Sequence, residues 1–90
     1  MLLNNGPYIN TRVIRGAYAD EYLVQGQSSK TYNWNTLVRY PATQKAIAEI
    51  DACNKARKFS ETVVGLVTAY DTNGYEIKSY LEGKLYETYE

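Results

Sequence analysis

An Asn-Gly dipeptide at positions 73 and 74 constrains the fold of this chain more than any other short segment. It separates two runs rich in β-forming residues, at positions 62–70 and 75–89. Because Asn and Gly both tolerate positive φ, this pair between two such runs is the strongest short-range signal for a tight hairpin. The sequence therefore predicts a C-terminal β-hairpin over residues 62–89, with its turn at residues 71–74.

The first run of this hairpin, residues 62–70, does not alternate between apolar and polar side chains. This pattern is typical of a central strand that is covered on both faces. One helix can cover only one face of a small sheet, so we expect the other face to form an apolar interface. The expected assembly is a two-fold homodimer, through the open face or an edge strand. Its candidate interface residues are Val63, Leu66, Val67, Tyr80 and Tyr86.

The second run, residues 75–89, reads as one long strand with an apolar face and a face of tyrosines and alternating charges. Its apolar residues Ile77, Leu81 and Leu85 also recur every four positions, so a helix remains an alternative for the last part. Gly83 indicates a bulge or a bend within this run.

Residues 41–58 have the pattern of an amphipathic helix. Pro41 suits the first helical position, where its missing N–H would have no partner. Apolar residues at three- and four-residue spacing predict one narrow buried stripe. That stripe consists of Ala46, Ile47, Ile50, Cys53 and Ala56.

The N-terminal part begins with an irregular lead-in at residues 1–7, followed by a strand over residues 8–18 and a return strand over residues 22–25. Residues 26–29 read as a loop, and residues 31–34 as a short third strand or as the approach to the helix. The order β-β-(β)-α-β-β predicts a single α+β domain spanning residues 1–90, an antiparallel sheet of four to five strands with one helix on one face.

The composition excludes several classes of site. The 90 residues contain no His and a single Cys. A Ser-His-Asp triad, a Cys-His pair, an imidazole or Cys-rich metal site and an internal disulfide are therefore impossible. The carboxylates lie in turns or alternate with lysines, as solvated residues do. We expect a non-enzymatic protein without a cofactor, in the cytoplasm, where an unpaired thiol stays reduced.

Tyrosine is the compositional outlier, with ten Tyr against one Phe and one Trp. So many tyrosines cannot all be interior in so small a domain, and surface Tyr is typical of binding patches. Residues 1–60 carry a charge balance of +4 and residues 61–90 one of −4, which favours docking on a charged partner. The candidate partner-binding residues are Tyr75, Glu76, Lys78, Tyr80, Glu82, Lys84 and Tyr86.

Basic and aromatic residues also interleave in the N-terminal half, which leaves two alternatives open. A small-ligand or nucleotide site, or a weak single-stranded nucleic-acid site, would use Arg12, Arg15, Trp34 and Arg39. A net charge of zero disfavours direct binding to a nucleic acid, because the counterion-release term is missing.

In its size, its β-β-(β)-α-β-β order and its lack of catalytic chemistry, the chain resembles small phage-encoded anti-CRISPR proteins with a bent antiparallel sheet and one helix. The resemblance lies in this overall pattern and in no diagnostic residue. It implies a stoichiometric inhibitor that occupies a nucleic-acid-handling surface of a host defence complex, with a host cytoplasmic location.

Overall fold

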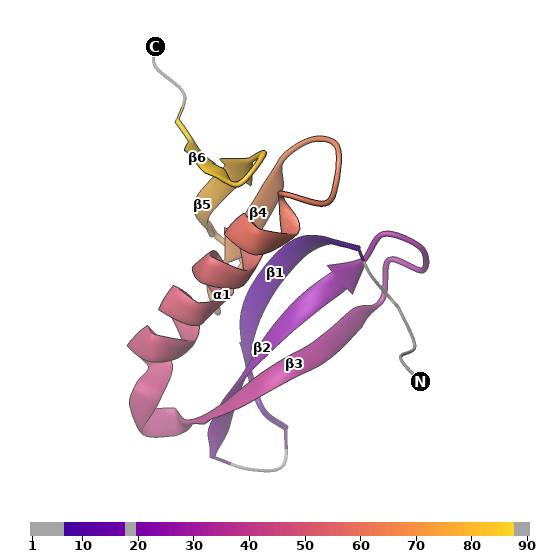
Figure 1. Cartoon of the computed structure of the whole chain (residues 1–90). Helices are drawn as coiled ribbons and strands as arrows, with labels where there is room; N and C mark the ends of the chain where they lie inside the picture. The colour runs from indigo at the N-terminus through magenta and orange to yellow at the C-terminus, as the bar shows by residue number, and fades with distance from the viewer. Residues whose placement is uncertain (1–6, 18–19, 88–90) are drawn as a thin grey trace.

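The structure is a computed structural model that describes residues 7–17 and 20–87. Six strands and one α-helix make two layers, in which the helix lies against one face of the sheet (Figure 1). The Cα atoms extend only 17 Å along the shortest axis, as two layers require. The elements in chain order are β1 (Tyr8–Arg15), β2 (Glu21–Ser28), β3 (Trp34–Pro41), a 3-10 turn (Ala42–Gln44), α1 (Lys45–Phe59), β4 (Val67–Tyr70), β5 (Glu76–Leu81) and β6 (Lys84–Tyr86).

The strands form one mixed sheet in the order β3-β2-β1-β4-β5-β6. Neighbouring strands are antiparallel except β1 and β4, where residues 10–12 pair in parallel with residues 68–70. The α+β class with one helix on a sheet is thus confirmed, whereas the sheet matches the expected antiparallel one of four to five strands only in part, because it has six strands and one parallel pair. The helix leads the chain from the edge strand β3 past β2 and β1, and such crossover connections join parallel strands.

The helix faces the sheet with small side chains. Ala48, Ala52 and Ala56 have no exposed surface, and Cys53 is also buried. Because these alanines are four residues apart, they form one smooth stripe along which the helix comes close to the strands. The Thr11 hydroxyl on β1 donates a buried hydrogen bond of 2.9 Å to the carbonyl oxygen of Ala52.

The predicted apolar stripe is therefore correct for Cys53 and Ala56 and wrong for the other three residues. Ala46 is exposed, and Ile47 and Ile50 expose 47% and 61% of their surface. A branched side chain between helix and sheet would hold the helix farther from the strands. The alanines therefore face the sheet, and Ile47 and Ile50 lie on the exposed sides of the helix. The helix also begins later than predicted, because Pro41 ends β3 and the next three residues form the 3-10 turn.

Two strands extend beyond their expected limits. β2 continues through Gly26 to Ser28, where we expected a loop. A Cβ at Gly26 would lie 2.9 Å from the ring of Tyr8, so glycine here allows one strand to pass beneath an aromatic ring. The third strand runs from Trp34 to Pro41 rather than over residues 31–34. β1 ends at Arg15; of the expected lead-in and first strand, residues 1–6 and 18 lie outside the described residues.

The C-terminal part confirms one predicted turn and adds another. Gly74 has a φ of 81°, and its N–H donates to the Asp71 carbonyl oxygen at 3.0 Å, so the Asn-Gly turn is in place. Residues 62–66 are not a strand, since the chain turns after the helix and Gly65 adopts a φ of 105°. The expected long strand is instead a second hairpin, because Glu82 and Gly83 both have positive φ. The helical alternative for this part is wrong, and residues 88–89 lie outside the described residues.

The close fit of the helix gives a stability prediction. Ala52→Leu should lower the free energy of unfolding by about 1–3 kcal/mol, because the added volume has no space against β1. Ile50→Ala should change it by less than about 0.5 kcal/mol, because Ile50 is largely exposed. Urea denaturation followed by circular dichroism measures both. A greater loss for Ile50→Ala than for Ala52→Leu would show that the wrong helix face has been assigned to the core.

Candidate functional site

The face of the sheet that points away from α1 is polar. Thr11 and Val13 point to the helix, so the alternation of side chains places Asn10 and Arg12 on the opposite face. The side-chain amide of Asn10 donates to that of Gln27 across the β1–β2 pair at 3.0 Å. Arg12 Nε donates a hydrogen bond to Gln25 Oε1 at 2.8 Å, and Gln25 Nε2 donates one to the Thr36 hydroxyl at 3.1 Å. The apolar open face expected from the sequence is therefore wrong.

Arg12 and Trp34 meet on this polar face. The guanidinium carbon of Arg12 lies 4.2 Å from the centre of the Trp34 ring, at a distance typical of cation–π contacts. Partial burial lowers the pKa of Arg12, because burial disfavours the charged form. Both side chains line a cavity of about 280 Å³. Its lining residues are Arg12, Ile14, Trp34, Tyr70, Asp71, Thr72 and Gly74.

The other two residues of the predicted ligand site are elsewhere. Arg15 is ion-paired with Asp20, and its guanidinium lies 5.3 Å from the ring of Tyr22. Arg39 is paired with Glu21, with 2.8 Å between Nη1 and Oε2. The predicted group of four is therefore reduced to Arg12 and Trp34. Sequence reasoning missed Tyr70 and Asp71 at this cavity, since only the parallel pairing of β1 with β4 brings them beside Arg12.

The predicted partner-binding face does not exist as one surface. Tyr80 is only 7% exposed and belongs to the core, because its side chain packs under the helix. The turn at Glu82 and Gly83 reverses the chain, so the residues before and after it belong to different strands. The remaining members are exposed: Tyr75, Glu76, Lys78, Glu82, Lys84 and Tyr86.

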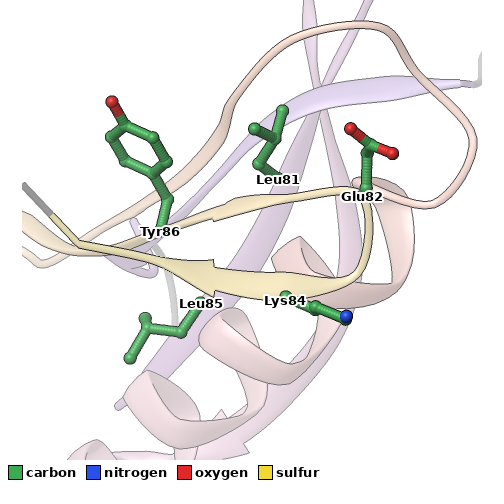
Figure 2. Close-up of a pocket in the computed structure, with 5 residues that line it drawn as sticks. All are labelled: Leu81, Glu82, Lys84, Leu85 and Tyr86. Atoms are coloured by element: carbon green, nitrogen blue, oxygen red, sulfur yellow. The ribbon is translucent and has the colours of Figure 1, made fainter.

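The second hairpin, β5–β6, instead presents apolar side chains on both of its sides. Leu81 and Tyr86 point to one side of the hairpin and Leu85 points to the other (Figure 2). Leu85 and Tyr86 expose 46% and 44% of their surface. Together with Glu82 and Lys84, these three residues line a cavity of about 520 Å³. The role of Leu81 and Leu85 was missed, although Gly83 was a signal for the turn that positions them.

The predicted dimer interface is only partly on the surface. Val67 has no exposed surface and Tyr80 is buried, because β4 and β5 lie beneath the helix. Val63 is half-buried against the core. Only Leu66 and Tyr86 are exposed. Residues 62–70 therefore do not form one strand covered on both faces, because β4 begins only at Val67.

Cys53 is buried, as predicted. Burial raises the pKa of its thiol, and a hydrogen bond with Tyr80 opposes this shift. Nucleophilic cysteines have a lowered pKa and an accessible sulfur, so Cys53 has the properties of a core residue. Among residues 7–17 and 20–87, no three His, Cys, Asp or Glu side chains are grouped so that they could hold a metal ion. No helix in this part of the chain is long and apolar enough to cross a membrane.

Comparison with known proteins returned no match to a family model, to a curated protein or to a solved structure. Two surfaces of the chain are therefore the candidates for its function. They are the Arg12–Trp34 cavity and the β5–β6 hairpin.

The burial of Cys53 gives a test of reactivity. A thiol reagent should label the folded protein at less than about one hundredth of the rate in denaturant, because labelling requires opening of the structure. The change in absorbance on addition of a chromogenic disulfide reagent measures both rates. Equal rates with and without urea would contradict the burial of this side chain.

Three raised pKa values give a pH prediction. Burial raises the pKa of Tyr80 and Cys53 above their ordinary values of 10.0 and 9.0. The hydrogen bond from Tyr40 to Asp51, 2.8 Å long, is the main cause of the raised pKa of Tyr40. In each case the unfolded chain loses its proton first as the pH rises. The contribution of these groups to the free energy of unfolding should therefore be constant below about pH 9 and should decrease above it. Urea denaturation across this range tests the sign, and a stability that increases above pH 9 would contradict it.

Proposed function

We propose that this chain is a non-enzymatic protein-binding module that contacts its partner through the β5–β6 hairpin. The observation that carries the proposal is the edge position of β6, which pairs with β5 and, within the residues that the structure describes, with no second strand on its other side. The outer backbone groups of an edge strand can add a further strand from another protein. Leu85 and Tyr86 flank this edge on opposite sides and would contact the added strand.

The hairpin is held to the body of the domain at its tip. The N–H of Gly83 donates to the Ser60 hydroxyl at 2.8 Å, and Ser60 itself is buried at the end of α1. The Ser60 hydroxyl also donates to the carbonyl oxygen of Arg57 at 2.6 Å. An edge that is already fixed in its extended conformation loses little entropy on binding, which favours affinity.

The charges beside this edge indicate the chemistry of the partner. Glu82 is exposed at the tip, and the Glu61 side chain lies near Gly83. A partner surface with arginines or lysines next to a free strand edge would complement these carboxylates. Such residues hold phosphates in nucleic-acid-handling proteins. The proposal therefore includes a stoichiometric anti-CRISPR-like inhibitor that occupies this surface of a host defence complex in the cytoplasm.

The same edge can pair with its equivalent in a second copy about a two-fold axis. A homodimer formed through β6 is therefore a second form of the proposed assembly. Its exposed contact residues would be Leu66 and Tyr86. Sedimentation equilibrium distinguishes the two forms of assembly. A mass of twice 10.3 kDa at micromolar concentration would indicate the dimer, whereas the single-chain mass would leave the edge free for another protein.

Affinity capture from a bacterial lysate tests the proposal with matched variants. Tyr86→Glu and Leu85→Lys should each reduce recovery of a specifically bound protein at least about tenfold, since each puts a charge into the contact. Ile50→Lys places a charge on an exposed part of α1 and should leave recovery unchanged. Mass spectrometry quantifies the captured protein, and circular dichroism checks that each variant is folded. Undiminished recovery by both folded hairpin variants would refute the hairpin as the binding surface.

A further inference from the structure

Arg12 is a cation without an anionic partner among residues 7–17 and 20–87. Within the described part of the chain, the ion pairs of arginine join Arg15 to Asp20 and Arg39 to Glu21, and no carboxylate lies within 4 Å of Arg12. The Nε of Arg12 donates to Gln25, and its ring-stacking partner is Trp34. Its two terminal nitrogens make no hydrogen bond to a described residue. A partly buried guanidinium that is held in place in this way is prepared to bind an anion.

The position of Arg12 is fixed by the strands beneath it. Gln25 is only 8% exposed and is itself held by its bond to the Thr36 hydroxyl at 3.1 Å. The guanidinium therefore reaches from β1 across β2 to the ring of Trp34 on β3. Because three strands determine its place, the terminal nitrogens need little reorganisation to bind a ligand.

The other walls of the Arg12–Trp34 cavity are aromatic and polar. Tyr70 pairs with Arg12 in the parallel register, and its ring lines the cavity together with that of Trp34. Asp71 Oδ1 accepts the backbone N–H groups of Asn73 and Tyr75, each at 2.9 Å, which fixes this carboxylate at the turn. Its Oδ2 has no donor among the described residues.

We infer that this cavity binds a nucleoside monophosphate. The terminal nitrogens of Arg12 would donate to the phosphate in a bidentate contact. The ring of Tyr70 would give the base a stacking surface beside the Arg12–Trp34 pair, and Asp71 Oδ2 would accept a hydrogen bond from a ribose hydroxyl. The volume of about 280 Å³ is close to the lower limit of small-molecule sites, roughly 300 Å³.

A free nucleotide fits this surface better than a nucleic-acid strand does. The chain has a net charge of zero, and Arg15 and Arg39, which do not line the cavity, are ion-paired with Asp20 and Glu21. A strand needs a series of free cations along its backbone, whereas one nucleotide needs a single site. The cavity adjoins the turn at residues 71–74, and the β5–β6 tip follows the other end of β5. The two sites can therefore be tested separately.

Trp34 is the single tryptophan of the chain, so its fluorescence reports directly on this cavity. Titration with AMP, excited where the nucleotide does not absorb, should give a saturable change in emission. Inorganic phosphate should compete at least about tenfold more weakly, because it lacks the base. Tyr86→Glu should bind AMP as the unaltered chain does, so a failure of the hairpin proposal would not affect this result.

The variants separate the anion contact from general effects of charge. Arg12→Gln should weaken AMP binding at least about tenfold, since charge-assisted hydrogen bonds are lost. Arg39→Gln is the matched control, because Arg39 is ion-paired and does not line the cavity, and its affinity for AMP should stay unchanged. Arg12→Lys keeps the charge but loses the planar fork, and it replaces Arg12→Gln if that variant does not fold.

Three outcomes would overturn the inference. The first is an absence of saturation at millimolar AMP, and the second is unchanged affinity in the folded Arg12 variants. The third is tighter binding of a single-stranded oligothymidylate than of AMP, with a steep loss of affinity at increasing salt, which would assign the surface to a nucleic acid.

Discussion

The close approach of α1 to β1 is the constraint on which the rest of the fold depends. It requires a helix face made of alanines and a hydroxyl on the central strand, and Thr11 and Ala52 meet these needs with a buried bond of 2.9 Å. A buried hydroxyl that loses its hydrogen-bond partner costs free energy. The bond between Thr11 and Ala52 therefore fixes both the position of the helix along β1 and its distance from the sheet. The parallel pairing of β1 with β4 follows, because the helix brings the chain back next to β1.

This arrangement gives the two faces of the sheet opposite properties. The face below the helix is filled by small and medium apolar side chains, and among the described residues no helix or second sheet covers the other face. Amide and guanidinium groups that bond to one another make that uncovered face compatible with water. The hydrogen bonds on this face hold Arg12 against Trp34. Leu85 and Tyr86 remain exposed because β6 lies at the edge of the sheet.

Local features of the fold could be predicted from the sequence, and features that depend on distant contacts could not. The turn at residues 71–74 was predicted from Asn73 and Gly74, although only Gly74 takes the positive φ expected of both, and the helix was predicted from its spacing. The buried face of the helix was misjudged, because a hydrophobic pattern favours Ile50 over Ala52, whereas the distance to the sheet selects the smaller residue. The turn at Glu82 was missed, since glutamate rarely takes positive φ. The interleaving of basic and aromatic residues placed Arg12 and Trp34 in one candidate site, but the pairing of three strands decides that these two side chains meet and that Arg15 and Arg39 do not join them.

The parallel pair of β1 and β4 also has a consequence for how the chain reaches its native state. β1, β2 and β3 are adjacent in sequence and can pair early, but β1 stays unpaired on its other side until residues 68–70 arrive. Closing so long a loop is slow compared with forming a hairpin. During synthesis, which proceeds from the N-terminus, the ribosome would therefore present a three-stranded sheet with one bare edge until nearly four-fifths of the chain had emerged. A nascent chain at that stage would be open to strand addition at β1, which is central in the native sheet, whereas the native sheet of the described residues has its edges at β3 and β6.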